Sequence, residues 1–324
     1  MESLKDSKAM NLTDAIFTDA DKAREHLEAQ RWPQGPICPH CGVVGEATSV
    51  GGKAARKGAY QCNAKECRKQ FSVTVGTVFE DSKVPLNKWL LATYLMSSSK
   101  KGISAHQLHR TLGVTYKTAW FMAHRIREAM NPSDPGPLGG EGKVVEVDEA
   151  YVGGKESNKH RNKRSPTKDR LYTKQIVVTL VERGGPVRSF HVANVTSKTV
   201  GKVIRTTASR ASHLMTDSAR LYPKVGREFA AHSAVDHSAG EYVRNFVHHS
   251  NTVENYFSIL KRGITGMFHH VSEAHLGRYL AEFDFRYSNR VGLGVDDEAR
   301  TNEALRGIEG KRLTYRRTDE AKVA

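Results

Sequence analysis

The chain has 324 residues, enough for one large domain or for two or three small domains with real cores. Lys and Arg total 50 against 35 Asp and Glu, which gives a formal net charge of +15. This excess is typical of proteins that bind a polyanion and makes nucleic acid the leading partner. No apolar run approaches the roughly 18 to 20 residues that span a bilayer. The N-terminus has mixed charges and no export signal, so we expect a cytoplasmic protein.

Four cysteines near the N-terminus are spaced like the ligands of a zinc ribbon. "CPHCG" contains Cys38 and Cys41, and "CNAKEC" contains Cys62 and Cys67. Such pairs in a reducing compartment are more often metal ligands than disulfides. Four sulfurs satisfy the tetrahedral preference of Zn²⁺ and leave no open position for water, so the site is expected to be structural. Four unrelated buried thiols are the alternative interpretation.

Three helices follow the ribbon in a helix-turn-helix pattern. Apolar residues at helical spacing predict the first over Leu86–Ser98, and Ser104 and Thr115 are expected to cap the second and third, with a turn at Gly113. The exposed face of the third helix would present Lys117, His124, Arg125 and Arg127 to phosphates and to guanine in the major groove. A plain helical hairpin packed on its neighbours is the alternative.

The second half of the chain alternates strands and helices. Strands are expected over Lys143–Val152 and in "QIVVTLVERGG", "VRSFHVANVT" and "HLMTDSARLYPKVG", with a helix in "SKTVGKVIRTTAS" before the fourth strand. Two further helices are expected in "HSNTVENYFSILKRGITGMFHH" and "SEAHLGRYLAEFDFRYSNR". This order predicts an α/β domain whose mixed sheet has helices on its faces, consistent with a ribonuclease H-like core.

Two aspartates stand where expected strands leave the sheet, a favoured place for ligand sites. If the first and fourth strands are neighbours, Asp148 and Asp217 face each other and can share Mg²⁺ or Mn²⁺, because hard oxygen ligands suit these ions. Each aspartate alone is a weak signal. Glu254 on the following helix would complete a two-metal site for phosphoryl transfer. Glu146 shares the sheet face of Asp148 and is interpreted as a rim residue, whereas Glu149 points to the opposite face.

The helix predicted over residues 249–270 gathers polar residues on one side. Glu254 and Lys261 are seven positions apart and fall within roughly 20° of each other around the helix axis, and Asn251 lies one turn before Glu254. Lys261 would hold a DNA phosphate near the reacting bond. The alternative is an ordinary solvated face with a coincidental spacing.

Two basic stretches lie outside the expected strands and helices of this domain. Residues 155–174 hold eight Lys or Arg, among them Lys163 and Arg164, and follow directly from the strand of Asp148. We expect this stretch to track a DNA backbone. The C-terminal residues are expected to form a frayed basic tail.

These patterns divide the chain into six parts. They are an N-terminal helical segment (1–34), a zinc ribbon (35–80), a helix-turn-helix DNA-binding region (81–131), a Pro- and Gly-rich linker (132–142), a catalytic domain (143–295) and a basic C-terminal tail (296–324).

Several of these segments together resemble one family. The catalytic segments of bacterial insertion-sequence transposases of the IS1595 (ISXO2-like) group are similar to "VEVDEAYVGGK", "LMTDSARLYPKVG" and "HSNTVENYFSILKRGITGMFHHVSEAHLGRYLAEFDFRYSNR". The zinc ribbon and helical region of that group resemble "CPHCG", "CRKQFSVTVGTVFEDSKVPL" and "TYKTAWFMAHRIREAM". The resemblance implies a DDE-type transposase on a ribonuclease H-like fold. It assigns Asp148 and Asp217 as metal ligands and leaves Glu254 and Asn251 to compete for the third position, of which we favour Glu254.

The expected partners are double-stranded DNA, at the element's ends and at the target, and further copies of the chain on DNA. Two other functions stay open. The chain could be a DNA-binding regulator with an inactive core, or a structure-specific nuclease that cleaves without joining strands. Metal-dependent cleavage and joining of end-sequence DNA would discriminate between these functions.

Overall fold

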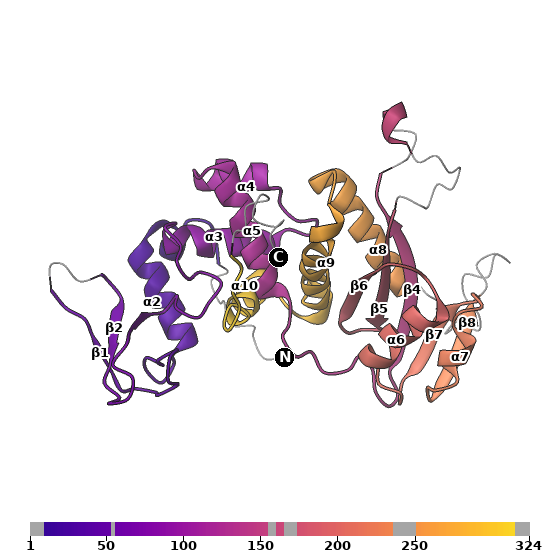
Figure 1. Ribbon diagram of the computed structural model, residues 1–324, viewed down its shortest axis with the longest axis horizontal. Coiled ribbons are helices and arrows are strands. Elements are labelled where there is room, and N and C mark those ends of the chain that lie inside the picture. The colour runs from indigo at the N-terminus through magenta and orange to yellow at the C-terminus, as the bar shows by residue number, and fades with distance from the viewer. Residues whose placement is uncertain (1–9, 53–55, 155–159, 165–173, 236–250, 315–324) are drawn as a thin grey trace, which may run out of the picture. The chain divides into compact units, whose positions relative to one another are not determined.

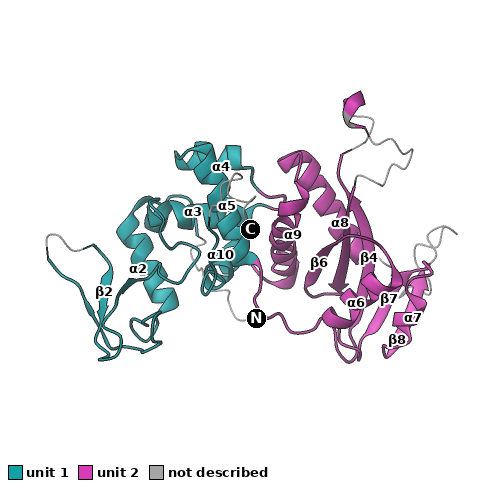
Figure 2. Cartoon of the chain, in the orientation of Figure 1, with its two compact units in different colours: residues 1–99, 103–130, 296–324 teal, residues 100–102, 131–295 magenta. Residues whose placement is uncertain are grey.

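The computed structural model describes residues 10–52, 56–154, 160–164, 174–235 and 251–314. The chain forms two compact units (Figure 2). Unit 1 comprises residues 1–99, 103–130 and 296–324, and unit 2 comprises residues 100–102 and 131–295. Among the helices in these described ranges, none has the length and apolar character needed to cross a membrane.

Unit 1 begins with two helices and a small antiparallel sheet. The helices are α1 (Ala15–Thr18) and α2 (Ala20–Arg31), and the sheet order is β1-β2-β3, with bounds Ala47–Ser49, Ala59–Cys62 and Gln70–Ser72. Trp32, at the end of α2, packs edge-on against the rings of Tyr60 and Phe71. This aromatic cluster joins the end of α2 to the ribbon's strands, so α2 and the ribbon share one core.

The three helices expected after the ribbon are confirmed. They are α3 (Leu86–Ser98), α4 (Ala105–Leu112) and α5 (Tyr116–Met130). The Ser104 hydroxyl accepts a hydrogen bond from the backbone N–H of Gln107, and Thr115 caps α5 in the same way. Gly113 has a φ of 60°, the left-handed conformation that glycine adopts without steric cost. The sharp turn between α4 and α5 therefore has the chemistry that the sequence predicted.

The segment expected as a basic C-terminal tail (296–324) begins with a helix. Asp297–Arg306 form helix α10, capped by the Asp296 carboxylate, and its Ala304 and Leu305 are buried within unit 1. Beyond the helix, Glu309 forms a β-bridge with Thr77. The chain thus returns to unit 1 after it has built unit 2. Residues 315–324 lie outside the described part.

Unit 2 is built on a mixed five-stranded sheet of order β6-β5-β4-β7-β8 (Figure 1). Its strands are β4 (Val144–Val152), β5 (Gln175–Glu182), β6 (Val187–Val192), β7 (His213–Asp217) and β8 (Ala231–Val235). The pairs β4–β5 and β5–β6 are antiparallel, whereas β4–β7 and β7–β8 are parallel. The predicted order of three strands, a helix and a fourth strand is confirmed, and the first and fourth strands are neighbours.

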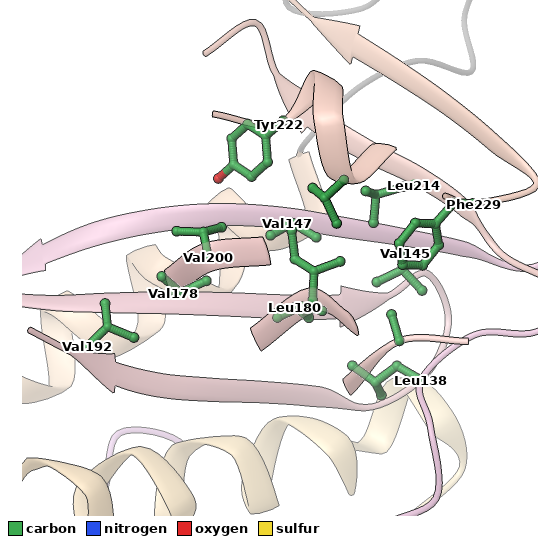
Figure 3. Packing of buried hydrophobic residues seen from close by; sticks show 13 residues of the cluster. Leu138, Val145, Val147, Val178, Leu180, Val192, Val200, Leu214, Tyr222 and Phe229 are labelled. Atoms are coloured by element: carbon green, nitrogen blue, oxygen red, sulfur yellow. The ribbon is translucent and has the colours of Figure 1, made fainter. Parts of the chain in front are cut away.

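Helices cover both faces of this sheet, each with its own apolar cluster. On one face, α6 (Ser197–Thr207) and α7 (Pro223–Gly226) pack with Val145, Val147 and Leu214 (Figure 3). On the other, α8 (Asn251–Gly263) and α9 (Glu273–Ser288) pack with Ala150 and Val152. The alternation of β4 therefore sends its odd-numbered residues toward α6 and its even-numbered residues toward α8.

The fifth strand, β8, was not expected from the sequence. Its "AHSAV" has one β-branched residue and little apolar alternation. It is held at the sheet edge by parallel pairing with β7 and by polar contacts between side chains, with His213 Nε2 2.9 Å from Ser233 Oγ and His232 Nε2 2.9 Å from Thr216 Oγ1. Tertiary pairing rather than local propensity makes this segment a strand.

Candidate active site

The four cysteines of unit 1 converge on one point. Their sulfurs all lie within 4.8 Å of one another, with Cys38 and Cys67 3.7 Å apart and Cys41 and Cys62 also 3.7 Å apart. A tetrahedral zinc ion with Zn–S bonds of about 2.3 Å separates its sulfurs by about 3.8 Å. The donor set and its spacing therefore fit a closed, structural Zn²⁺ site.

The two aspartates of unit 2 lie on neighbouring parallel strands. Glu146 of β4 is in register with Met215 of β7, and Asp148 and Asp217 each lie two residues beyond this pair on their own strand. Asp217 ends β7, whereas Asp148 lies inside β4 rather than at its end, because β4 continues to Val152. Both aspartates are partly buried and both lie on the sheet face that α8 covers.

Helix α8 carries the other polar residues of the predicted site. Its buried face contributes Val253, Phe257 and Leu260 to the apolar cluster between α8, α9 and the sheet. Asn251 is its first residue, and Glu254 lies in its first turn; both are exposed. Lys261 is exposed two turns later, with its ammonium 5.8 Å from the centre of the Phe257 ring. The one-sided arrangement of Asn251, Glu254 and Lys261 is thus the solvent face of an amphipathic helix packed on β4.

The electrostatics of Asp148 reveal how negative this region is. Burial raises the pKa of Asp148 to about 7, and the nearby carboxylates of Glu149, Asp217 and Glu254 add to the rise, while a hydrogen bond of 2.8 Å from the Glu149 N–H opposes it. Three acidic neighbours act on one carboxyl group, and Asn251 contributes no charge. A cation bound among these groups would relieve their mutual repulsion.

These carboxylates nevertheless do not form a closed cluster. In the part of the chain that the structure describes, the only group of three or more Cys, His, Asp or Glu whose ligand atoms lie within 4.8 Å of one another is the cysteine group. Asp148, Asp217 and Glu254 are therefore more widely spaced than the thiols. A divalent ion such as Mg²⁺ keeps waters and binds phosphate oxygens as part of its coordination shell, so its protein ligands do not require such a closed arrangement.

The remaining acidic residues of β4 have separate partners. Glu149 points to the opposite face, as predicted, and accepts a hydrogen bond of 2.5 Å from the Tyr222 hydroxyl. Burial raises the pKa of Glu149 and that of Tyr222. Glu146 is not the expected rim residue: its side chain is fully buried and accepts hydrogen bonds from Arg183 and from the first turn of α8. No local sequence signal indicates this role, since Glu146 and Thr252 are 106 positions apart.

The predicted DNA-reading face of α5 is wrong in three of its four residues. His124, Arg125 and Arg127 are 1%, 6% and 2% exposed, and only Lys117 is exposed. The Arg125 guanidinium lies 5.4 Å from the centre of the Trp89 ring and donates a hydrogen bond to the Glu80 carbonyl. The spacing of apolar residues could not predict this burial, because Arg125 occupies a helix position that the pattern assigns to the exposed face.

The basic stretch after β4 is described only in part. Residues 155–159 and 165–173 lie outside the described residues, as does the side chain of Lys163. Arg161–Lys163 form a short 3-10 turn, and Arg164 follows it with an exposed side chain. The predicted contact of Lys163 and Arg164 with DNA stays a prediction.

Two family descriptions match the chain. The ISXO2-like transposase domain matches residues 137–288, and the transposase zinc-ribbon domain matches residues 18–70, which include α2. An uncharacterized protein in transposable element ISH50 of Halobacterium salinarum is 32% identical over 288 residues, which are 83% of this chain and 91% of that protein. A chain in the cryoEM structure of the simian T-cell lymphotropic virus intasome in complex with PP2A regulatory subunit B56 gamma is 18% identical over 58% of this chain and 66% of its own length, with a TM-score of 0.29, too low to bear on the fold. With its ribbon and its mixed-sheet domain both matched, the chain belongs to the family of ISXO2-like transposases.

Proposed function

We propose that the chain catalyses metal-dependent cleavage of DNA at the ends of a transposable element and the transfer of the freed strand into target DNA. The observation that carries the proposal is the parallel pairing of β4 with β7, in which Asp148 and Asp217 each lie two residues beyond the pair Glu146 and Met215, on the sheet face packed by the helix that carries Glu254. Membership of a transposase family supports the same reaction. The mixed sheet agrees with the ribonuclease H-like core that this family implies.

Asp148, Asp217 and Glu254 would hold two Mg²⁺ or Mn²⁺ ions. Hard oxygen donors suit these ions, and the repulsion that raises the pKa of Asp148 is what bound cations would offset. When bound there, the ions would supply activation of the attacking oxygen and stabilisation of the leaving oxygen in an in-line displacement at phosphorus. The carboxylates fix the reacting groups in place, first for attack by water and then for attack by the exposed 3′ hydroxyl, and no covalent intermediate with the protein is needed.

We favour Glu254 over Asn251 as the third ligand. Glu254 acts on the Asp148 carboxyl group electrostatically, whereas Asn251 is uncharged. A carboxylate also neutralises a divalent ion better than an amide does. Lys261, two turns further along the same helix face, would hold a DNA phosphate beside the reacting bond.

DNA would be engaged by more than the acidic site. The net charge of +15 favours a polyanion. Lys117 at the start of α5 and Lys163 and Arg164 after β4 are the candidate contacts with phosphates, while the buried Arg125 and Arg127 no longer are. We also propose that the protein works as a homo-oligomer, because joining one element to a target requires two ends to be held together.

The first test replaces single oxygens in the site. Asp148→Asn and Asp217→Asn should lower end cleavage and strand transfer by about a thousandfold or more while end-DNA binding persists. Glu149→Gln is the matched control, since Glu149 is adjacent in sequence but points to the opposite face, and should stay within about threefold of wild type. A fully active Asp148→Asn protein would contradict the proposal.

The second test distinguishes Glu254 from Asn251 as the third ligand, and a transposase from a nuclease or a DNA-binding regulator. Loss of catalysis in Glu254→Gln but not in Asn251→Ala supports Glu254, and the reverse result transfers the role to Asn251. End-sequence DNA with a target duplex distinguishes the reactions: a transposase produces joined strands, a structure-specific nuclease produces only cuts, and a regulator with an inactive core binds the ends without changing them.

A further inference from the structure

Glu146 is a buried carboxylate that ties β4 to the start of α8. Its Oε2 accepts hydrogen bonds from the backbone N–H groups of Thr252, at 2.9 Å, and Val253, at 3.0 Å. Its Oε1 accepts from the Thr252 hydroxyl at 2.9 Å and from Arg183 Nε at 2.5 Å. The side chain is fully buried, so these bonds are shielded from water.

These contacts do for α8 what a cap does for other helices. The first N–H groups of a helix have no partners within the helix, and its N-terminus carries partial positive charge. A carboxylate there satisfies the donors and is stabilised by the dipole. Such caps usually come from the residue just before the helix, as Ser104 does for α4. In the first turn of α8, a strand residue 106 positions away provides these acceptors.

The position of this cap matters because of its neighbours. Glu146 lies two residues before Asp148 on the same face of β4, and its partner Thr252 lies two residues before Glu254 in α8. The apolar contacts of Val253 and Phe257 hold the helix on the sheet, but such contacts are non-directional. Two backbone N–H groups bonded to one oxygen set the axial position of the helix start, and with it the distance between Glu254 and Asp148.

We propose that Glu146 is a positioning residue that holds Glu254 in place as the third metal ligand. Its charge is offset by the Arg183 guanidinium, so it can stay buried beside the site without acting as a ligand itself. The inference rests on the proposed role of Glu254. It predicts that Glu146 sets metal affinity through the geometry of α8.

The test is Mn²⁺ binding to the full-length protein, followed by electron paramagnetic resonance of the free ion. Glu146→Gln keeps the size of the side chain, but its amide group offers only one acceptor oxygen to the donors of Thr252, Val253 and Arg183. Metal affinity should fall about tenfold or more, the usual consequence of losing a residue that orients a ligand. The Mg²⁺ concentration for half-maximal strand transfer should rise by a similar factor, while end-DNA binding is unchanged.

Glu282→Gln is the matched control. Glu282 is also a fully buried glutamate paired with an arginine, Arg286, but both residues belong to α9. Its replacement should lower thermal stability without changing Mn²⁺ affinity. Equal Mn²⁺ affinities in Glu146→Gln and Glu282→Gln would overturn the inference, because the effect would then be only that of a lost buried charge.

Two further variants complete the design. Thr252→Val removes only the hydroxyl bond to Glu146 and should weaken Mn²⁺ binding by about threefold, even if Glu146→Gln does not fold. Wild-type affinity in Thr252→Val together with a misfolded Glu146→Gln protein would reduce Glu146 to a purely structural role. Glu254→Gln distinguishes the failure of the two proposals. Wild-type Mn²⁺ affinity in Glu254→Gln would refute Glu254 as the third ligand. Weak Mn²⁺ binding in Glu254→Gln together with wild-type binding in Glu146→Gln would refute only the positioning role of Glu146.

Discussion

Arg125 of α5 and Asp148 of β4 are both charged residues that the sequence marks as functional, and the two units give them opposite surroundings. In unit 1, the Arg125 guanidinium is enclosed by the rings of Trp89 and Phe121 and bonded to the Glu80 carbonyl. In unit 2, Asp148 stays partly open and has acidic neighbours instead of a cation. An enclosed and satisfied charge supports the fold, whereas a charge left with like-charged neighbours is available to a ligand.

The cysteine site belongs with Arg125 in this comparison. Its four sulfurs satisfy a zinc ion completely, and two of its cysteines, Cys38 and Cys62, are buried. The carboxylates around Asp148 are more widely spaced than these sulfurs. We therefore expect one metal to be part of the fold of unit 1 and the other metals to come and go in unit 2.

Removing metal should produce the largest difference between the two units, because only unit 1 should then unfold in part. Structural zinc contributes on the order of 10 kcal/mol to small zinc domains, so chelation or Cys62→Ala should unfold the ribbon. Amide spectra by NMR should lose the dispersed signals of residues 35–80 and keep those of the β4–β7 sheet. Magnesium-free buffer is the control and should leave both units folded. A ribbon that stays folded without zinc would contradict the structural role of the cysteines.

Replacing the buried arginine should have the next largest effect. Arg125→Ala leaves the Glu80 carbonyl without this donor and removes the stacking on Trp89, which should lower the free energy of unfolding of unit 1 by about 3 kcal/mol. Thermal denaturation followed by circular dichroism measures the change. Arg125→Lys keeps the charge but loses the planar stacking, and should recover only part of the stability. Unchanged stability in Arg125→Ala would contradict the supporting role of this residue.

Asp284 tests whether a raised pKa by itself marks a functional carboxylate. Burial raises its pKa from 3.8 to about 7, the same value as for Asp148, although Tyr256 and Ser189 donate hydrogen bonds to it and Arg188 lies near. The folded state holds this proton more tightly than the unfolded chain, so stability should fall as the pH rises from about 4 to about 7. Because Asp284 is only partly buried, Asp284→Asn should remove a dependence on the order of 1 kcal/mol.

The measurement is urea denaturation of both proteins at several pH values in this range. We expect catalysis by Asp284→Asn to stay near that of wild type, because its partners Tyr256 and Ser189 are not among the proposed metal ligands. Parallel stability curves for the two proteins would show that Asp284 does not titrate in this window.

The fold could be predicted where the signal was local. The period of two in β4 and the apolar run before Asp217 predicted two strands and the carboxylates they carry. Helix α10 also had local signals, a capping Asp296 and acidic residues in its first turn, which the excess of charge near the C-terminus obscured. By contrast, β8 depends on its pairing with β7, and no property of its own five residues indicates a strand.

The proposed ligands could be named from the sequence, whereas the residues that support them could not. Asp148, Asp217 and Glu254 are marked by residue type and position along the chain. The surroundings of Glu146 and Arg125 depend on partners 106 and 45 positions away in the sequence. Their burial follows from tertiary packing that no short sequence pattern encodes. Both were therefore expected at the surface and are found inside.

Lys117 offers the finest test of the comparison, because it shares α5 with Arg125 but is exposed. Near the N-terminal end of the second helix of a helix-turn-helix, a lysine can reach a DNA phosphate. Lys117→Ala should leave thermal stability unchanged, weaken end-DNA binding by about threefold and reduce the salt slope by about one. Lys22→Ala is the matched control, since it removes the same charge from an exposed residue of α2 that pairs with Glu25. If both variants weaken binding equally, only net charge matters; if Lys117→Ala alone does so, the start of α5 contacts DNA while its buried end supports the fold.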